Sequence, residues 1–303
     1  MVSNFKSYEI KVNELMSSHT SFKIGGSCDS FVLPKTIEGI KSVISFVNED
    51  KLPLLIIGNG TNLLFPDNGF SGVVMQIGEP YFCDVGAVRE LPLRVGAGIS
   101  ISRLLEITVE RGLSGLEFMS GIPGTLGGAI TMNAGAFGKR IGEIVKRVKI
   151  INRKGEVYWI GNEEIEFGYR ESRFKRSEGA YLPREEFEII LSAELKLKRD
   201  DSSKIKARIQ EIVKSRESRL PIEFPSAGCV FKNPEDKPAG ELIELASCKG
   251  LRIGDAQVST RHANFIVNLG NASYKDVKAL IEEVQRKVYQ KFKISLDLEL
   301  IIL

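Results

Sequence analysis

The feature that most restricts the fold of this 303-residue chain is a pair of glycine-rich loops, the first of which directly follows a short apolar run. That run is Pro53–Ile57, and the loop after it reads Gly58-Asn59-Gly60-Thr61-Asn62. Seven glycines fall between Gly121 and Gly142, where average usage of about 7% gives about one or two. Glycine lets backbone N–H groups approach a ligand closely, and successive N–H groups in such turns bind anions. The two loops together favour a cofactor that carries a diphosphate.

Neither loop matches the commonest nucleotide-binding templates. The first lacks the third glycine of a dinucleotide-binding fingerprint, because Leu63 stands at that position. In the second, Gly138-Lys139 is followed by Arg140, where a phosphate-binding P-loop has serine or threonine. Tight turns of a β-rich domain are therefore the alternative to a cofactor site.

Hydrophobic periodicity predicts a mixed α and β chain without internal repeats. Thr36 and Ser100 are expected to cap the helices that follow them, and Lys154-Gly155 to form the turn of a hairpin. Apolar and polar residues alternate from Ile294 to Leu300, which predicts a terminal strand. Further strands are expected over Gly72–Ile77, Leu91–Ala97 and Phe187–Leu197, and amphipathic helices over Ile205–Val213 and Val277–Val288. The change of pattern near residue 200, with a weaker one near residue 85, predicts domains over residues 1–85, 86–200 and 201–303.

Composition excludes several classes of protein. With 42 basic and 39 acidic side chains, the net charge of +3 is too small to indicate a nucleic-acid partner. A hydrophobic fraction of 43% excludes wholesale disorder, and no apolar run approaches the ~18 residues of a membrane span. The N-terminus lacks the apolar core of a signal peptide. The two histidines are far apart, and so are the cysteines, Cys28, Cys83, Cys229 and Cys248. We therefore expect a soluble, cytoplasmic protein with neither a metal site nor a disulfide framework.

Four later residues carry chemically useful groups, and each has a structural alternative. Arg170 lies beside aromatic residues and can grip a carboxylate or phosphate with two hydrogen bonds, although solvated basic turns are commoner. Cys229 follows a glycine within a proline-bounded turn. A thiol with an ordinary pKa of about 8.5 can donate a proton or act as a nucleophile, whereas most cysteines are apolar fillers. Glu299 lies on the polar face of the predicted terminal strand, where simple solvation is the alternative. His262 either faces a ligand or caps a turn.

The ordered set of these segments resembles the UDP-N-acetylenolpyruvoylglucosamine reductase (MurB) family over almost the whole chain. Each match is modest, but their order is highly specific. The short spacing between Pro234 and His262 is similar to that of the type II branch, which lacks an extra tyrosine-bearing loop. The matching segments are His19–Gly26, Gly58–Leu64, Gly115–Phe118, Gly121–Gly128, Asn133–Ala136, Gly168–Phe174, Pro225–Gly228, Phe231–Pro234 and the segment with Glu299.

The resemblance implies an α+β protein with an FAD-binding fold of the PCMH, or vanillyl-alcohol-oxidase, type. Residues 1–85 and 86–200 would form the two FAD-binding subdomains, and residues 201–303 an α/β substrate-binding domain. Residues implied to contact FAD are Gly58, Asn59, Gly60, Thr61, Asn62, Gly121, Ile122, Pro123, Gly124, Thr125, Gly127, Gly128, Asn133 and Gly135. Lys232, Asn233 and His262 are the candidates for contact with the substrate, although Lys232 and Asn233 could instead hold their turn.

The activity that the resemblance implies is a two-step reduction. NADPH would reduce FAD, and hydride would then pass to UDP-N-acetylglucosamine enolpyruvate to give UDP-N-acetylmuramate for peptidoglycan synthesis. Arg170 and Glu299 match the pair that stabilises the enolic intermediate, and Cys229 stands where the family has its proton donor. The chain departs from the family pattern at this donor, which is commonly serine, and at Leu220-Pro221, where a Gln-Pro pair is common.

Two other functions are compatible with these residues. One is a flavin oxidase of the same fold that acts on an alcohol or a sugar acid, and its reduced flavin would react rapidly with oxygen. The other is a non-catalytic protein that binds a nucleotide sugar and would stay colourless after incubation with FAD. In each case the expected partner is a small molecule and not a nucleic acid or a membrane, and the chain is expected to be a monomer or a weak homo-oligomer.

Overall fold

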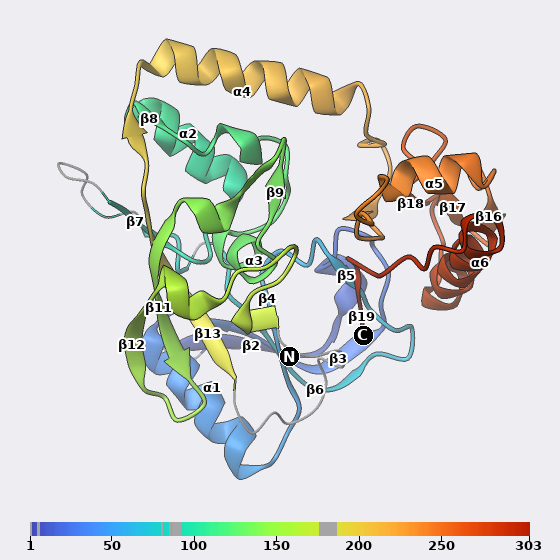
Figure 1. The fold of residues 1–303 in the computed structure, drawn as a ribbon. Coiled ribbons are helices and arrows are strands. Elements are labelled where there is room, and N and C mark those ends of the chain that lie inside the picture. The colour runs from blue at the N-terminus through green and yellow to red at the C-terminus, as the bar shows by residue number, and fades with distance from the viewer. Residues whose placement is uncertain (1, 5–6, 80, 85, 87–91, 176–186) are drawn as a thin grey trace. The chain divides into compact units, whose positions relative to one another are not determined.

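A computed structural model describes residues 2–4, 7–79, 81–84, 86, 92–175 and 187–303. It has the expected mixture of helices and strands, and it divides into two compact units (Figure 1). The first unit comprises Met1–Asn13, Asp29–Asn59 and Ser71–Ser215, and the second comprises Glu14–Cys28, Gly60–Phe70 and Arg216–Leu303. Each unit has its own buried apolar core. The division into three domains stays a prediction, and residue 85, its first boundary, lies outside the described residues.

The first unit is built mainly on two sheets. One has the order β1-β2-β3-β6-β4, with β4 parallel to β6, and the other has the antiparallel order β12-β11-β13-β7. The strand expected over Leu91–Ala97 corresponds to β7, and its expected first residue, Leu91, lies outside the described residues. The strands of the first sheet are Val2–Asn4 (β1), Tyr8–Leu15 (β2), Ser27–Pro34 (β3), Phe70–Gln76 (β6) and Leu54–Ile57 (β4). Those of the second are Val157–Gly161 (β12), Val145–Asn152 (β11), Glu188–Leu195 (β13) and Leu93–Gly96 (β7).

Two short ladders and several helices complete this unit, and the last helix runs slightly past its end at Ser215. Two-stranded ladders join Leu113–Ser114 (β8) to Lys198–Arg199 (β14) and Gly135–Ala136 (β9) to Lys139–Arg140 (β10). The helices are Ile37–Glu49 (α1), Ile101–Glu110 (α2), Leu126–Thr131 (α3) and Ser202–Glu217 (α4). The expected caps of α1 and α2 are confirmed: Thr36 accepts a hydrogen bond from the Gly39 amide at 3.1 Å, and Ser100 from the Arg103 amide at 3.3 Å.

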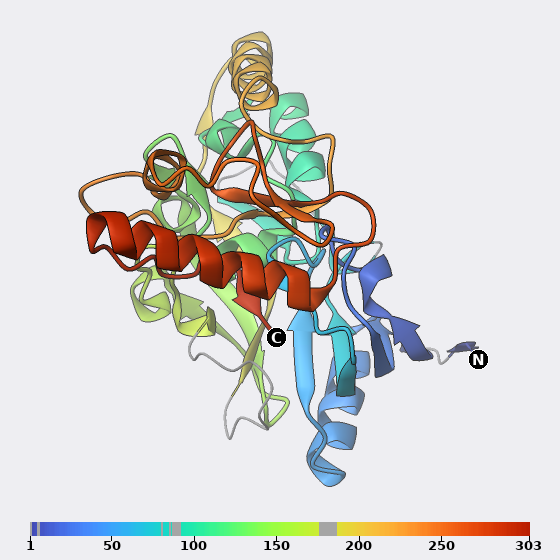
Figure 2. The same ribbon diagram turned by 90° about the vertical axis from the view of Figure 1, so that its right-hand side faces the viewer.

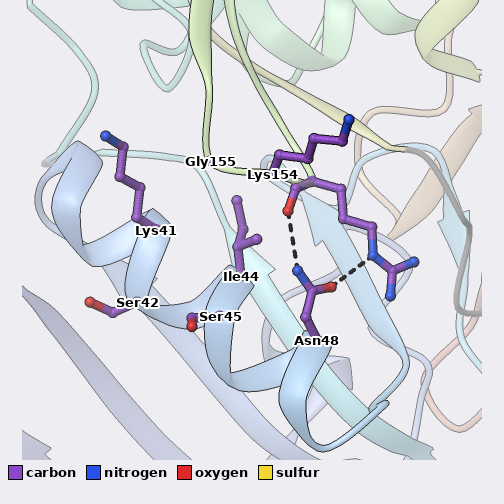
Figure 3. A pocket seen from close by; sticks show the side chains of 8 residues that line it. Lys41, Ser42, Ile44, Ser45, Asn48, Lys154 and Gly155 are labelled. Atoms are coloured by element: carbon purple, nitrogen blue, oxygen red, sulfur yellow. Dashed lines mark hydrogen bonds between the residues drawn. The ribbon is translucent and has the colours of Figure 1, made fainter.

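The hairpin β11–β12 is tied to α1 by a pair of hydrogen bonds. The Asn48 side-chain amide donates to the Arg153 carbonyl at 3.1 Å, and Arg153 Nε donates to Asn48 Oδ1 at 2.7 Å (Figure 3). The buried stripe of α1, which includes Ile40 and Ile44, packs into the same apolar core as the hairpin. The predicted turn at Lys154-Gly155 is thus confirmed, and two long-range bonds add to its local turn chemistry.

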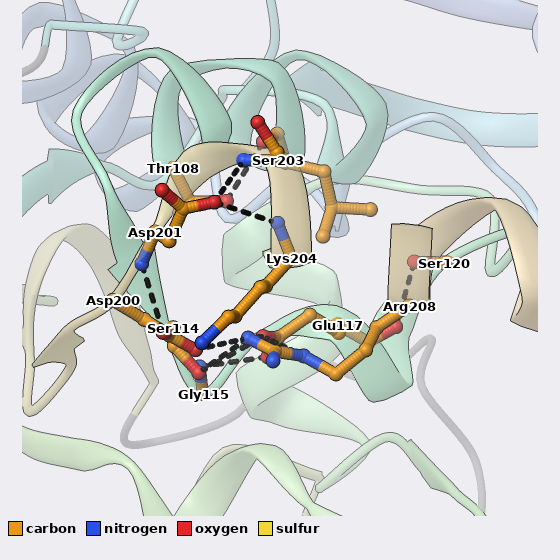
Figure 4. A network of polar contacts seen from close by, with 11 residues as sticks. Thr108, Ser114, Gly115, Glu117, Ser120, Asp200, Asp201, Ser203, Lys204 and Arg208 are labelled. Atoms are coloured by element: carbon orange, nitrogen blue, oxygen red, sulfur yellow. Dashed lines mark hydrogen bonds and ion pairs between the residues drawn. The ribbon is translucent and has the colours of Figure 1, made fainter. Parts of the chain in front are cut away.

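The helix α4 contacts its surroundings through ion pairs of Arg208 as well as through its apolar stripe. Arg208 donates to Glu117 at 2.8 Å and to Asp200 at 2.6 Å, close to the N-terminal part of the helix (Figure 4). Burial raises the pKa of Glu117, but hydrogen bonds from backbone amides, Arg208 and Ser114 outweigh it and lower the pKa overall. Of the helix itself only Ile205 is fully buried. The predicted amphipathic helix is confirmed, since Ile205 is buried and Ile209 packs against the apolar core.

A second charged cluster lies on the sheet β12-β11-β13-β7. Glu194, whose side chain is 5% exposed, is paired in register with Arg147 on one neighbouring strand and Arg94 on the other. Arg147 donates two hydrogen bonds of 2.8 Å to the carboxylate, and Arg94 donates one of 3.0 Å. The hydrogen bonds from Arg147 are the main reason why the pKa of Glu194 falls from 4.5 to about 2. The bond from Arg94 lowers this pKa further, whereas burial raises it. Both guanidinium groups also lie over the ring of Trp159, at 4.5 and 5.1 Å.

Replacing Glu194 with glutamine is expected to lower stability at neutral pH by about 1–2 kcal/mol. The lowered pKa corresponds to at most about 3 kcal/mol, and the exposure of both arginines reduces that value. Because the pKa is lower in the folded state, this stabilisation is full above pH 4.5 and disappears as the pH falls toward 2. Urea unfolding followed by fluorescence of Trp159, the chain's one tryptophan, at pH 7, 5, 4 and 3 measures it. The exposed Glu106→Gln is the control; equal stability of wild type and Glu194→Gln at pH 7 would contradict the prediction.

The second unit joins an antiparallel sheet to two helices. The sheet has the order β15-β18-β17-β16, and α6 packs on β16 and β17 (Figure 2). Ser273 caps α6 by accepting a hydrogen bond from the Asp276 amide at 3.1 Å, and the Asp276 carboxylate accepts one from the Ser273 amide. The elements are Ser226–Cys229 (β15), Phe265–Asn268 (β18), Ala256–Val258 (β17), Arg252–Ile253 (β16), Ala239–Leu245 (α5) and Tyr274–Phe292 (α6). All five apolar residues predicted for the α6 stripe are buried: Val277, Leu280, Ile281, Val284 and Val288.

The predicted terminal strand is largely wrong. Only Ile301–Ile302 (β19) is a strand, and it pairs in parallel with Leu63–Leu64 (β5). The apolar residues before it still tend toward the interior, since Leu296 and Leu300 are buried. Their backbone bonds, however, surround a single antiparallel bridge between Phe231 and Leu298: the Lys232 amide donates to the Asp297 carbonyl at 2.8 Å, and the Glu299 amide to the Val230 carbonyl at 2.9 Å. Alternating burial therefore occurs here without a ladder.

Candidate active site

The two glycine-rich loops touch within the first unit. The first loop begins at Gly58, at the carboxyl end of β4, where the Gln76 side chain donates to the Gly58 carbonyl at 2.9 Å. A Cβ atom at Gly58 would lie 2.3 Å from Thr125 Oγ1, in the second loop, so no side chain fits. Ligands of sheets with parallel strands bind beyond the carboxyl ends of those strands. Close contact of two small-residue loops at such an end fits a diphosphate-bearing cofactor.

The second loop leads into α3, but the start of that helix is occupied by the protein itself. The Leu126 amide donates to the Ile99 carbonyl at 2.9 Å, and the Gly127 amide to the Ala97 carbonyl at 2.8 Å. Thr125 Oγ1 accepts from the Gly128 amide at 3.2 Å. The first-turn amides of α3 therefore hold the helix against the end of β7, and any contact of this loop with a phosphate falls to the residues before Thr125.

Asn133 joins the second loop to the turn that carries Arg170. It is 3% exposed, its side-chain amide donates to the Gly168 carbonyl at 2.6 Å, and its Oδ1 accepts from the Gly142 amide at 3.1 Å. Ser172 adds a hydrogen bond of 2.7 Å to the Thr131 carbonyl. Asn133, one of the expected cofactor contacts, thus uses both ends of its amide within the protein.

Arg170 is held in a strained and well-defined position. Its φ of +58° lies in the left-handed region, which costs a non-glycine residue about 1 kcal/mol or more. Its Nη2 donates to the Gly135 carbonyl at 3.1 Å, and its guanidinium lies 5.8 Å from the centre of the Tyr169 ring. Arg140 approaches the same ring at 5.6 Å. A strained residue fixed in this way is typical of functional sites.

Cys229 lies at the end of β15 in the second unit. The β15 register shifts between Ser226, which pairs with Val267, and Cys229, which pairs with Phe265. Gly228 has a φ of +79°, and no atom lies within 4 Å of the point where its Cβ would be. Cys229 is therefore a half-buried residue at the end of a shifted strand, and open space adjoins the preceding Gly228.

Glu299 is brought next to this strand by the C-terminal segment. Its amide donates to the carbonyl of Val230, the residue after Cys229, at 2.9 Å. The Glu299 carbonyl accepts from the Asn62 side chain at 2.9 Å. The second unit therefore places the backbones of Cys229 and Glu299 in adjacent segments, and it adds Asn62 from the first glycine-rich loop.

Of the expected substrate contacts, Asn233 has a clear structural use. Its Oδ1 accepts from the Ala239 amide at 2.9 Å, at the first residue of α5. Lys232 is fixed through its backbone, which donates to the Asp297 carbonyl at 2.8 Å. The geometry supports the alternative in which these two residues hold their turn, while contact with substrate stays a prediction.

His262 lies beside Phe265, the strand partner of Cys229, with 5.0 Å between the ring centres. Its Nδ1 accepts from the Asn264 amide at 3.3 Å, as expected for a capped turn. Burial lowers its pKa, and the positive charges of Lys249, Arg219 and Arg216 lower it further. We therefore expect a neutral imidazole at pH 7.

Arg216, Arg219 and Lys249 were missed by the sequence analysis. Arg216 and Arg219 lie at and after the end of α4, at no recognisable spacing from Cys229. No local signal identifies them, because only the fold of the second unit brings them to this site. Their positive charges lower the pKa of His262.

A cavity of about 540 Å³ lies elsewhere in the first unit, between α1 and the hairpin β11–β12 (Figure 3). It is open, and it is lined by Lys41, Ser42, Ile44, Ser45, Asn48, Arg153, Lys154 and Gly155. None of these is an expected site residue, and Asn48 and Arg153 are bonded to each other. This cavity is therefore not the candidate active site.

Comparison with known proteins gives consistent matches over both units. Residues 28–161 match the model of the FAD binding domain, and residues 220–303 match that of the UDP-N-acetylenolpyruvoylglucosamine reductase C-terminal domain. UDP-N-acetylenolpyruvoylglucosamine reductase of Clostridium tetani is 38% identical over 305 residues, covering 100% of this chain and 95% of the relative. That of Anoxybacillus flavithermus is 42% identical over 290 residues, covering 96% and 93%.

A solved structure is similar as well. The crystal structure of UDP-N-acetylenolpyruvylglucosamine reductase (MurB) from Thermus caldophilus has a TM-score of 0.79 and 32% identity, and the match covers 100% of this chain and 99% of that one. The expected FAD-binding α+β fold is thereby confirmed. Within the described residues, no helix combines the length and hydropathy needed to cross a membrane. This chain belongs to the UDP-N-acetylenolpyruvoylglucosamine reductase family and is an FAD-binding oxidoreductase.

Proposed function

We propose that this protein catalyses the NADPH-dependent reduction of UDP-N-acetylglucosamine enolpyruvate to UDP-N-acetylmuramate in peptidoglycan precursor synthesis in the cytoplasm. Family membership supports the reaction class. The observation that supports the assignment of residues is the hydrogen bond between the Glu299 amide and the Val230 carbonyl. It puts the backbone of Glu299, the candidate for stabilising the enolic intermediate, beside the residue that follows the candidate proton donor Cys229.

The glycine-rich loops are the part of the chain that would hold FAD, through Gly58–Asn62 and Gly121–Gly124. When bound, FAD supplies hydride transfer, with NADPH as the source of the electrons. Close contact between Gly58 and Thr125 leaves no room for a side chain at Gly58, and successive backbone amides of such turns form concave sites that bind anions such as a diphosphate. The side chain of Asn133 is expected to stabilise the second loop and not to contact FAD, because both ends of its amide are already hydrogen-bonded within the protein.

Arg170, Glu299 and Cys229 are assigned to the substrate. Addition of hydride to the methylene carbon leaves an electron pair on the adjacent carbon, which is shared with its carboxylate. The fixed guanidinium of Arg170 would stabilise this charge, and the carboxyl group of Glu299, when protonated, would donate a hydrogen bond to it. Cys229 would then transfer its proton to the carbon, and the resulting thiolate would recover a proton from water.

Anaerobic visible absorbance tests the proposal. The purified protein is reduced with NADPH and then mixed with the enolpyruvyl sugar nucleotide. We expect the flavin band to bleach and then to return. Bleaching without return would exclude this substrate; rapid return with oxygen alone would indicate an oxidase. A protein that stays colourless with added FAD would exclude flavin chemistry altogether.

A further inference from the structure

Ser21 contacts both Gly60, in the first glycine-rich loop, and β15, the strand that ends at Cys229. All of these residues belong to the second unit. The Ser21 amide donates a hydrogen bond to the Gly60 carbonyl at 3.1 Å, and its hydroxyl donates one to the Ser226 carbonyl at 2.7 Å. Ser226 is the first residue of β15. One residue thus holds the loop through its backbone and the strand through its side chain.

The segment around Ser21 is firmly held. The side chain of the next residue, Phe22, is fully buried in the core of the second unit. The Phe22 carbonyl accepts a hydrogen bond at 3.1 Å from the buried side chain of Asn268, in the strand β18 that pairs with β15. The preceding residue, Thr20, donates from its hydroxyl to the Ile24 carbonyl at 3.1 Å. Ser21 is therefore a fixed point from which its hydroxyl can hold β15.

The strand β15 depends on such a contact because its ladder is irregular. Its first residue, Ser226, pairs with Val267. Its last residue, Cys229, pairs with Phe265, so that β15 has one residue more than β18 over this stretch. A bulge of this kind bends the strand and re-aims the side chains beside it. The position of Cys229 is therefore not determined by the ladder alone.

A second connection to the loop follows Cys229 in the sequence. The Glu299 amide donates to the Val230 carbonyl at 2.9 Å. The Glu299 carbonyl accepts at 2.9 Å from the side chain of Asn62, which belongs to the same glycine-rich loop as Gly60. The loop is therefore linked by hydrogen bonds to the chain on both sides of Cys229, and the link before it runs through the hydroxyl of a single serine.

We propose that Ser21 is a positioning residue, and that its hydroxyl determines the position of Cys229 relative to the first glycine-rich loop. The inference rests on the proposed function, in which that loop holds FAD and Cys229 donates a proton to the substrate. In that reaction hydride and proton are added to adjacent carbon atoms, so the proton donor has to keep a fixed position relative to the flavin. A displacement of about 1 Å can slow such a step about 10²-fold.

Stopped-flow absorbance of the two half-reactions tests the inference. Ser21→Ala loses the hydroxyl bond to Ser226 and keeps the backbone bond to Gly60. We expect NADPH to reduce its flavin within about twofold of the wild-type rate, while return of the flavin band at saturating enolpyruvyl sugar nucleotide slows about 10-fold. The half-saturating substrate concentration is expected to stay within about twofold, because binding contacts are kept. Ser21→Thr keeps a hydroxyl and is expected to come within about threefold of the wild-type rate.

Ser202→Ala is the matched control. The Ser202 hydroxyl donates to the Val109 carbonyl at 2.6 Å in the first unit, and neither residue is an expected site residue. This variant therefore loses a hydrogen bond of the same kind as Ser21→Ala does. We expect the two variants to lose melting temperature by similar amounts, and Ser202→Ala to keep both half-reactions within about twofold of the wild type.

Return of the flavin band at the wild-type rate in Ser21→Ala overturns the inference, and so does an equal loss in Ser21→Thr or in Ser202→Ala. Equal slowing of both half-reactions in Ser21→Ala also overturns it, because that result indicates a general structural role. If Ser21→Ala does not fold, Ser21→Cys decides, since a thiol is a weak hydrogen-bond donor: an unchanged rate contradicts the inference. A wild-type flavin that bleaches without return refutes the proposed function itself, whereas wild-type return without an effect of Ser21→Ala refutes only the inference.

Discussion

Replacing Cys229 with alanine is expected to slow reduction of the enolpyruvyl substrate by about 10²–10⁴-fold, the usual contribution of a positioned general acid. Flavin reduction by NADPH is expected to proceed as in the wild type, because that half-reaction needs no proton from this thiol. The cost to the fold is expected to be small, since Cys229 is half-buried at a strand end with open space at Gly228.

Two matched variants make the result specific. Cys229→Ser places a hydroxyl at the same position and is expected to retain turnover, because a hydroxyl can also donate a proton. Cys83→Ala removes a partly buried thiol of the first unit and is expected to leave both half-reactions unchanged. Stopped-flow absorbance of the flavin band separates the half-reactions. Turnover of Cys229→Ala at the parental rate would show that the thiol is not the acid.

The parts of the fold that could be predicted are those with local causes. Thr36, Ser100 and the α6 stripe were identified correctly, because a cap or a period of 3.6 residues is determined within one turn. The terminal strand was wrong because a period of two indicates only alternating burial. The pairing partner of Ile301–Ile302 lies more than 200 residues earlier, at Leu63–Leu64, and nothing local indicates such a partner.

The candidate site divides in the same way. Cys229 and Glu299 could be singled out from their residue types and their match to a known family. The role of Asn133 could not, because its two bonds reach Gly142 and Gly168 and depend on the packing of separate turns. The charges beside His262 were missed for the same reason: Arg216 and Arg219 lie more than 40 residues before it in the sequence.

Replacing Arg170 with lysine is expected to slow enolpyruvyl reduction by about 10²-fold, although the positive charge is kept. The guanidinium is fixed by the Gly135 carbonyl and by the Tyr169 ring, and its planar fork can bind a carboxylate through two hydrogen bonds. A lysine ammonium is a point charge without that fork. Backbone strain does not explain the expected loss, because lysine and arginine meet the same cost at a φ of +58°.

Arg173→Lys is the matched control for this prediction. Arg173 lies three residues away and donates to Glu188 at 2.7 Å and to the Glu164 carbonyl at 3.1 Å, so its contacts are internal. We expect this variant to reduce the substrate within about twofold of the wild-type rate, since exposed or partly exposed ion pairs contribute little. Single-turnover return of the flavin band measures both variants, after each has been fully reduced by NADPH. Equal rates for Arg170→Lys and Arg173→Lys would mean that the Arg170 fork does not act on the substrate, and the developing charge would then have to be met by other groups.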